Sequence, residues 1–541
     1  MHRIKFTDRE KQMSKASATH KVLLKSSAVI MAATLLSRVF GLVRTKVVNY
    51  YFTQELLDPF WYAYKIPNTF RELLGEGALS AAFIPVFTSF LVKYGDEESS
   101  KLGSNVLNIL AATVLVLAGA GMLCAKWFMP VYLTGLAADT ARLVLAVDLT
   151  SIMMPFLLCA SIGAVIMGIL NGKKHFFAPA FAPILSSIGM ITTIALFHKA
   201  VGPHILGWGV LIGGLCQLCF QIPFLRGRGF RYSFSFNLRH PGVQEVLRLM
   251  VPAAMALGVV QLNQLIAPFF ASYFRGGMAA LQNSILLVQM PHGVFAIALS
   301  TALLPALSEH ATRGDNDAFR KSISDGLGLV LLFSIPSALF LLFMGPGVID
   351  AVFIGGKFTT IDLERTARAL FYHSFGLIGM GGTVLANRFF YSLRDMRTPF
   401  IVAILSVLLN LICNIVFHLL GLGFALIALS NSIAVTANFI TLLLLVQKRI
   451  GRFQWRTIFL ECGRITTASC AFVATSILIW NLLAQAVPDT FLWKLTRLGI
   501  SGAGGGMLFL MIARLLGIRE ISMVAEYINR RLRGKGKNSD W

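Results

Sequence analysis

The sequence predicts an all-α integral membrane protein with about fourteen transmembrane helices. They form two six-helix lobes related by a pseudo-twofold repeat, followed by two C-terminal helices. Of its 541 residues, 56% are hydrophobic and 13% are charged, whereas soluble domains carry roughly 25% charged residues. No Asp, Glu, Lys or Arg occurs between Arg397 and Lys448, or between Arg275 and Glu309. A bilayer core takes about 20 apolar residues per helix, so the first of these runs holds two spans.

Only helices and closed barrels satisfy their backbone polar groups in lipid, and continuous apolar runs lack the alternation of a barrel. Each charge-poor stretch is therefore expected to be a helix. The stretches are 22–51, 60–92, 104–125, 142–172, 177–198, 204–225, 246–274, 281–308, 326–349, 366–391, 398–418, 421–447, 465–486 and 493–516. The first twenty residues are polar, and no cleavable signal peptide is expected.

Lys and Arg are distributed unevenly over the loops between these stretches. One set of alternate loops, with both tails, carries 34 of them, and the other set carries 8. Because positive residues collect on the cytoplasmic side, both termini are expected in the cytoplasm of a bacterial cell, in a multi-pass inner-membrane protein. The formal net charge of +23 then reflects topology, and no nucleic-acid partner is expected.

The sequence repeats itself at a spacing of 220 residues. Ala78–Pro85 reappears as Ala298–Pro305, and Asn171–Pro179 aligns with Tyr391–Pro399. Two motifs about a hundred residues apart that keep one spacing indicate a duplicated lobe, and transporters commonly bind substrate between such repeats. The predicted organisation is a cytoplasmic tail 1–21, an N-lobe 22–225, a cytoplasmic linker 226–245, a C-lobe 246–447, two further helices in 448–516 and a basic cytoplasmic tail 517–541.

Seven cysteines lie mostly inside apolar runs, where Cys behaves as a small hydrophobe. Cys216 and Cys219 form a CxxC pair, but no second pair or nearby His completes a metal site. No metal site is predicted.

The first two stretches are exceptional because they contain charges. Arg38 lies about sixteen residues into the first helix, roughly 24 Å along its axis. A charge at the bilayer centre costs about 2.5–3.5 kcal/mol, so these residues are expected to line a hydrated cavity. Arg38 and Arg44 are about 120° apart on the helical wheel, with Gly41 between them, and Arg71 lies in the second helix. We expect these three arginines to bind an anionic substrate, because guanidinium forks match phosphate oxygens.

The second stretch also contains Asp58, Lys65, Glu72 and Glu76. Lys65, Glu72 and Glu76 lie on one strip of the helix, where an internal salt bridge is an alternative to substrate contact. Lys65 also lies close enough to a helix end to extend its amine toward water.

The opening of the chain resembles the MurJ/MviN lipid II flippases of the multidrug/oligosaccharidyl-lipid/polysaccharide exporter superfamily. The resemblance rests on Ser37-Arg-Val-Phe-Gly-Leu-Val-Arg44, Asp58, Lys65-Ile-Pro-Asn68, Arg71 and Glu76-Gly-Ala. Further matches are Asn171-Gly, Pro179-Ala, Gly356-Lys-Phe-Thr359, Phe390-Tyr-Ser-Leu-Arg-Asp395 and Thr398-Pro. It covers about residues 22–450.

The resemblance implies alternating access, a central cationic cavity and a groove for the polyprenyl tail near the last two helices. It assigns substrate contacts to positions matching Arg38, Arg44, Arg71, Lys65, Asp58, Glu76 and Asn68. The chain departs from the family pattern at an Asp-Arg pair, here Ile285 and Leu286, and at Thr45, where the family has Asp. His292 or Gln289 is expected to replace part of the missing pair.

Some relatives bind sodium through polar groups in later helices. The matching candidates here are Asn263, Asn410, Asn414 and Ser430. Asn410 and Asn414 are one helical turn apart, and interhelical hydrogen bonding is the simpler interpretation of these amides. No cofactor is predicted; sodium or the membrane potential is the candidate energy source.

The resulting hypothesis is a transporter, not an enzyme: a monomer that moves lipid II, or a related undecaprenyl-diphosphate glycolipid, from the cytoplasmic to the periplasmic leaflet. An exporter of another polyprenyl-diphosphate glycan and a small-molecule antiporter of the same superfamily are the alternatives. An antiporter would need a titratable acid deep in the first helix, which the sequence lacks. A membrane glycosyltransferase would need an acidic cluster in a large extracytoplasmic loop, and the longest such loop, about 350–365, is short.

Overall fold

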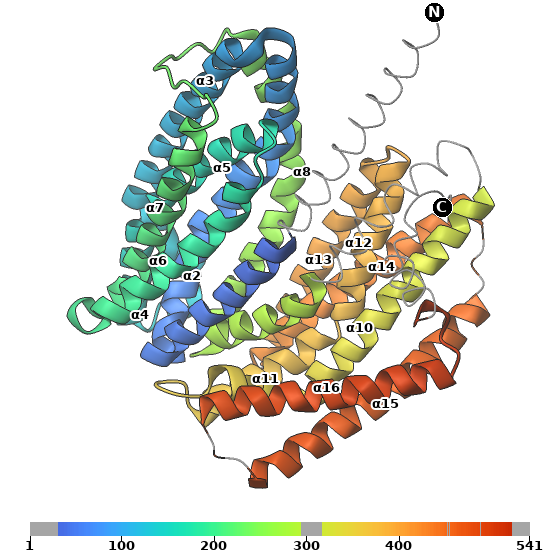
Figure 1. The fold of residues 1–541 in the computed structure, drawn as a ribbon. Coiled ribbons are helices and arrows are strands. Elements are labelled where there is room, and N and C mark those ends of the chain that lie inside the picture. The colour runs from blue at the N-terminus through green and yellow to red at the C-terminus, as the bar shows by residue number, and fades with distance from the viewer. Residues whose placement is uncertain are drawn as a thin grey trace, which may run out of the picture. The chain divides into compact units, whose positions relative to one another are not determined.

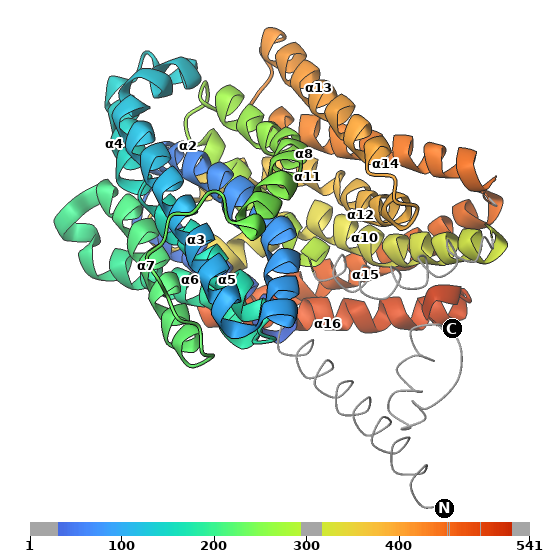
Figure 2. The ribbon, with the colours of Figure 1, turned by 90° about the horizontal axis from the view of Figure 1, so that it is seen from above.

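A computed structural model describes residues 31–293 and 316–521, apart from 452, 454, 487 and 489. Its regular structure in these ranges is helical, with an isolated bridge between Gly355 and Phe358. Figures 1 and 2 show the helices from two directions. The prediction of an all-α membrane protein is confirmed.

The chain divides into two compact units. Unit 1 comprises the residues up to Val48, Tyr62–Tyr132 and Asp139–Gln261, and unit 2 comprises Asn49–Trp61, Leu133–Ala138 and Leu262 onward. Residues 246–261, which the sequence assigns to the second lobe, therefore pack within unit 1. The predicted lobe boundaries follow the sequence repeat rather than packing, and they stay a prediction.

Long helices form the first half of the chain, and most of their residues lie in unit 1. Residues 31–51 are helical. The following elements are α2 (Gln54–Phe70), the π-helix η1 (Arg71–Gly77), α3 (Ala78–Tyr132), α4 (Thr140–Met153), α5 (Phe156–Gly172), α6 (Phe177–Val201), α7 (Ile205–Arg226) and α8 (Pro241–Ala271), with short 3-10 turns η2 (Thr134–Leu136) and η3 (Gly202–His204). The start of α2, the turn η2 and the end of α8 belong to unit 2. Gly95 interrupts α3 with φ 79°, and it separates the predicted second and third spans. The predicted span 142–172 contains a turn at Met154 and Pro155, between α4 and α5, where Pro155 has no backbone N–H to donate to the preceding turn. Leu79, Phe83, Phe87, Val165 and Ile169 belong to the buried core of unit 1.

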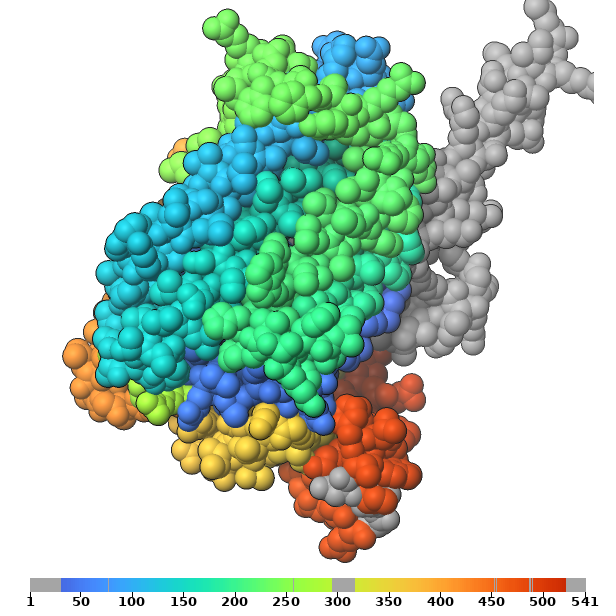
Figure 3. Space-filling model, turned by 90° about the vertical axis from the view of Figure 1, so that its left-hand side faces the viewer, coloured from blue at the N-terminus to red at the C-terminus, as the bar shows by residue number. Residues whose placement is uncertain are grey.

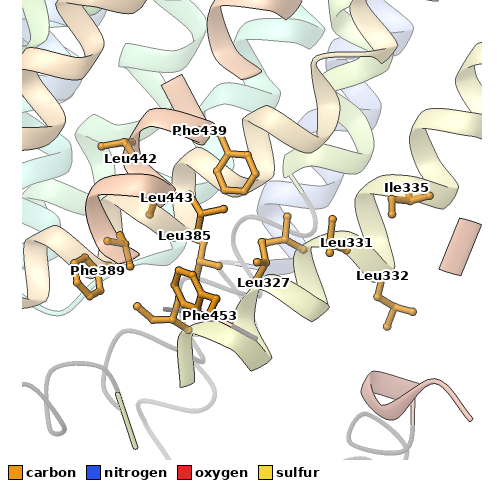
Figure 4. Packing of buried hydrophobic residues seen from close by; sticks show 14 of the residues in the cluster. Leu327, Leu331, Leu332, Ile335, Leu385, Phe389, Phe439, Leu442, Leu443 and Phe453 are labelled. Carbon is orange, nitrogen blue, oxygen red and sulfur yellow. The ribbon is translucent and has the colours of Figure 1, made fainter. Parts of the chain in front are cut away.

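Unit 2 continues with helical residues 277–293. It then contains α10 (Asn316–Phe353), α11 (Thr360–Ser374), α12 (Leu377–Ser392), α13 (Arg397–Leu419), α14 (Ala425–Ile450), α15 (Trp455–Ala486) and α16 (Phe491–Leu515). Figure 4 shows part of its core, where Leu327 and Leu331 of α10 lie among Leu385 and Phe389 of α12 and Phe439 of α14. Apolar side chains of three helices thus form one buried cluster.

Eight helices in the described residues are long and apolar enough to cross a membrane, or ten if two pairs bent by 41° are each one span. One of the eight, Gln54–Tyr132, has 79 residues. Since a bilayer needs about 20 residues per crossing, this helix contains more than one span. The total of fourteen stays a prediction.

The 220-residue repeat is visible in the helix boundaries. The pairs α4 and α11, α6 and α13, and α7 and α14 each begin 220 residues apart, and α5 and α12 begin 221 apart. Lys174 and Arg394, also 220 apart, are the non-glycine residues with positive φ, at 60° and 58°, in the described part of the chain. His175 and Asp395 follow them, and each donates its backbone N–H to the carbonyl five residues earlier. Two turns of the same rare geometry indicate duplication of the local structure. The segment Ala298–Pro305 lies outside the described residues, and superposition of the halves stays a prediction.

The last two helices of unit 2, α15 and α16, pack against each other, and Figures 1 and 2 show their course. A Cβ added to Gly505 of α16 would lie 2.2 Å from Oγ of Ser476 in α15. The Ser476 hydroxyl donates to the Ser501 carbonyl at 3.1 Å. Small residues permit this close approach of two membrane helices.

Candidate functional site

The two arginines of the first helix stand among exposed apolar residues. Arg38 and Arg44 are half-buried, whereas Val39 is 54% exposed. A Cβ added to Gly41, between the arginines, would meet no atom within 4 Å. The helix therefore has room beside Gly41 for a group larger than a methyl.

Thr45 stands where the family pattern has Asp. Its side chain is buried, and its hydroxyl donates to the Gly41 carbonyl at 3.0 Å, one turn earlier in the same helix. Threonine is thus accommodated by a local backbone contact. An aspartate would add a negative charge beside Arg44, and the threonine leaves this part of the helix more cationic.

Arg71 is held by its neighbours at the junction of α2 and η1. Its Nε donates to Oδ1 of Asn68 at 3.1 Å, and Nδ2 of Asn68 donates to Oε1 of Glu72 at 2.8 Å. Nη2 of Arg71 lies 3.7 Å from the same Glu72 oxygen. The Arg71 side chain remains 21% exposed. Asn68 and Glu72 therefore fix the orientation of a guanidinium that is still accessible to a ligand.

The local backbone is a π-helix, a form that frequently occurs at functional sites. It ends at Gly77, where an added Cβ would lie 2.4 Å from Cδ1 of Leu257 and 2.8 Å from the Glu72 carbonyl oxygen. Close packing against α8 thus requires glycine there. Lys65 is half-buried six residues before Arg71, while the side chain of Glu76 lies outside the described part of the chain.

Asp58 is fully buried in unit 2. Its two carboxylate oxygens accept the backbone N–H groups of Gly276 at 2.6 Å and Ala279 at 2.9 Å. These groups lie at the start of the helical residues 277–293, where a negative charge is stabilised by the helix dipole. The geometry makes Asp58 a helix cap, and direct contact between Asp58 and substrate stays a prediction.

A polar contact that the sequence did not predict lies close by. The side-chain amides of Asn49 and Asn283 each donate to the other at 3.0 Å, and both residues are fully buried. Ser284 follows, and its hydroxyl lies 2.8 Å from Nδ1 of His373. These residues precede Ile285 and Leu286. Uncharged amides in apolar runs leave no charge signal, so only their occurrence in long hydrophobic stretches could have marked them.

The asparagines considered for sodium do come together. Nδ2 of Asn410 donates to Oδ1 of Asn263 at 2.7 Å, and Nδ2 of Asn414 donates to Oδ1 of Asn410 at 2.9 Å. The Ser430 hydroxyl instead donates to the Leu426 carbonyl of its own helix. This chain of amides has the form expected of interhelical hydrogen bonds, and it leaves Oδ1 of Asn414 buried with no hydrogen-bond donor. Sodium binding at these residues stays a prediction. Among the described residues, no group of three or more His, Cys, Asp or Glu could hold a metal ion.

Gln289 is exposed and His292 is half-buried. Their replacement of the missing Asp-Arg pair stays a prediction.

Charged side chains set into the apolar helices of a polytopic fold are typical of a membrane transporter.

The comparisons with known proteins identify the group of transporters. A family profile described as lipid II flippase MurJ matches residues 47–496. The lipid II flippase MurJ of Burkholderia cenocepacia is 32% identical over 470 residues, 85% of this chain and 90% of the relative. A probable lipid II flippase MurJ of Vibrio cholerae is 31% identical over 519 residues, covering 92% and 97% of the two chains. This chain belongs to the lipid II flippase MurJ family.

Solved structures agree with this assignment. A lipid II flippase MurJ in an inward closed conformation has a TM-score of 0.74 and 26% identity, over 90% of this chain and 98% of that one. An inward-facing multidrug resistance transporter of the MATE family and MOP superfamily has a TM-score of 0.63 at 14% identity, over 76% and 94%. The second likeness shows the shared fold alone.

Proposed function

We propose that this protein is a lipid II flippase, moving lipid II from the cytoplasmic to the periplasmic leaflet by alternating access, and that Arg38, Arg44 and Arg71 bind the diphosphate of the substrate. The observation that carries the proposal is the orientation of Arg71 by Asn68 and Glu72, with its guanidinium still partly exposed. Family membership supports the same substrate.

The chemistry of the three side chains favours a diphosphate. A guanidinium forms two parallel hydrogen bonds to phosphate oxygens, and it stays protonated at any physiological pH. A guanidinium has five N–H donors in a fixed fork, and the Arg71 side chain is 21% exposed. A ligand can therefore reach it.

An antiporter of cationic drugs with the same fold is the second candidate. Such a protein needs a carboxylate deep in the helices that line its site. In unit 1, the described carboxylate nearest to Arg71 is Glu72, which is paired with Arg71 and accepts from Asn68. A paired carboxylate does not favour an organic cation, and this arrangement supports the anionic substrate.

The setting in the cell follows from the charge distribution of the sequence. The multi-pass protein is proposed to lie in the bacterial inner membrane as a monomer with both termini in the cytoplasm, because 34 of the loop and tail Lys and Arg residues lie on one side.

Two energy sources are proposed as alternatives. Sodium would bind to the side-chain oxygens at and around Asn414 Oδ1. The membrane potential would instead act on the charges of the arginine site. Flipping measured with sodium replaced by potassium separates them, because the rate falls only if sodium drives the cycle.

The test is complementation of a strain depleted of its own flippase, with lipid II accessibility measured outside the cell. The parental protein should restore growth and external lipid II, whereas Arg38→Ala, Arg44→Ala and Arg71→Ala should not. Arg→Lys variants should restore them partly, because lysine keeps the charge but loses the fork. If all three alanine variants reached the membrane and supported parental lipid II flipping, the diphosphate site would be wrong. If the parental protein failed although it was inserted, the proposed substrate would be wrong.

A further inference from the structure

Residues 227–240 join α7 to α8 without forming a helix, and we refer to them as the linker strand. Figure 3 shows this segment, in green, on the outer surface of unit 1 beside α3, in blue. Backbone N–H groups of Arg231, Ser233 and Asn237 donate to side-chain oxygens of α3. A loop that is attached at three backbone positions has a defined conformation.

The side chains of α3 that hold the linker strand lie on one face of that helix. They are Ser100, Ser104, Asn105 and Asn108. The amide of Asn108 donates to the Ser235 carbonyl at 2.9 Å. Spacings of three and four residues place such side chains on one helical face. The sequence of α3 thus contains a polar stripe matched to an extended backbone.

Phe230 fixes the beginning of the linker strand. It is 7% exposed within the unit 1 core. A Cβ added to Gly103 of α3 would lie 2.9 Å from Cε2 of Phe230, so glycine makes room for the ring. The segment is therefore attached through both a buried ring and its backbone.

The attached segment nevertheless exposes large apolar side chains. Phe234 is 83% exposed, and Tyr232, Phe236 and Leu238 are 56%, 54% and 54% exposed. Exposed arginines flank them, at positions Arg226, Arg228, Arg231 and Arg239. Three acids of α3 have cationic partners: Asp96 pairs with Lys173, and Glu97 and Glu98 pair with Lys101. The surface is both apolar and cationic.

We propose that the linker strand binds the headgroup layer of an anionic membrane leaflet. Its aromatic rings would enter the interfacial zone, and its arginines would contact lipid phosphates. The strand connects two membrane helices, α7 and α8, so its ends are held near a membrane surface. Aromatic side chains are enriched in that zone, and a polybasic segment beside it is attracted by anionic lipids.

This surface is distinct from the substrate arginines. Its ligand is the bulk anionic lipid of the membrane, and it would set the height and tilt of unit 1 relative to that leaflet. Exposure of four large apolar side chains to water on a fixed backbone is unfavourable, because the free-energy cost of hydrating them grows with the exposed apolar area.

The test is spin labelling of Phe234→Cys in the full chain without its native cysteines. The protein is reconstituted in vesicles of phosphatidylglycerol and phosphatidylcholine. Collisions with oxygen report lipid, and collisions with a water-soluble nickel chelate report water. Val116→Cys, at a 70% exposed position of α3, is the lipid-facing control. Lys357→Cys, in an exposed turn, is the aqueous control.

We expect the label at Phe234 to resemble the Val116 control, with oxygen collisions exceeding nickel collisions. Adding Arg231→Gln and Arg239→Gln should shift it toward the Lys357 control in vesicles with phosphatidylglycerol, and should have no effect in phosphatidylcholine alone. A label that resembles the Lys357 control, or one shielded from both reagents by other parts of the chain, would overturn the proposal. An unchanged label in the arginine variants would overturn the role of anionic lipid.

Discussion

Replacing Asp58 by Asn tests whether this carboxylate is a helix cap. The variant keeps the size of the side chain but has one acceptor oxygen, whereas Asp58 accepts from both Gly276 and Ala279. One backbone N–H would then face an amide NH₂. A hydrogen bond to a charged group contributes about 1.5–3 kcal/mol, and the loss of charge at a helix start adds up to about 2 kcal/mol. The expected destabilisation is therefore about 1.5–5 kcal/mol.

Thermal unfolding of the purified protein in detergent measures this change. Asp58→Asn should unfold several degrees below the parent, and Glu55→Gln, exposed in the first turn of the same helix, should cost at most about 1 kcal/mol. Lipid II affinity of the folded variant should remain close to parental. If Asp58→Asn unfolded at the parental temperature but bound lipid II weakly, Asp58 would be a substrate contact and the cap assignment would be refuted.

Three further predictions concern stability and are measured by thermal unfolding. Gly505→Val should destabilise the folded protein by about 1–3 kcal/mol through overpacking against Ser476. Gly506→Val is the control, because a Cβ there meets no atom within 4 Å. Equal effects of the two substitutions would contradict the packing. Burial raises the pKa of Glu520, so the native protein favours its neutral form and loses stability as pH rises. Glu520→Gln should therefore be more stable than the parent at pH 7 but not near pH 4.5, and a pH-independent difference would argue against this. Burial and, secondarily, the charge of Arg228 lower the pKa of His175, whose ring nitrogen accepts a hydrogen bond from Arg228. The native protein therefore favours the neutral ring, and it should lose stability as the pH falls below about 6.5. His175→Asp should remove that loss.

The membrane helices could be predicted from the sequence because an apolar run must form its own backbone hydrogen bonds in lipid. The spans predicted at 177–198 and 398–418 correspond to α6 and α13 within three residues at each end. The break at Pro155 was not predicted, because two short helices and one long helix have the same apolar composition.

The site was only partly predictable. Arg38, Arg44 and Arg71 are conspicuous because charge is rare in a membrane helix. Asn68 contacts Arg71 and Glu72, which lie three and four positions after it, a spacing that a helix brings together. The backbone partners of Asp58 lie 218 and 221 residues away, and a cap formed with a distant helix start has no signature in the local sequence.

The affinity of the purified protein for lipid II in nanodiscs tests the central claim most directly. Arg71→Ala removes a charge-assisted contact worth about 1.5–3 kcal/mol, so binding should weaken roughly ten- to a hundred-fold, with Arg71→Lys in between. Arg464→Ala, which removes an exposed arginine paired with Glu461, should bind as the parent does. Parental affinity in Arg71→Ala would contradict the assignment of this arginine to the diphosphate.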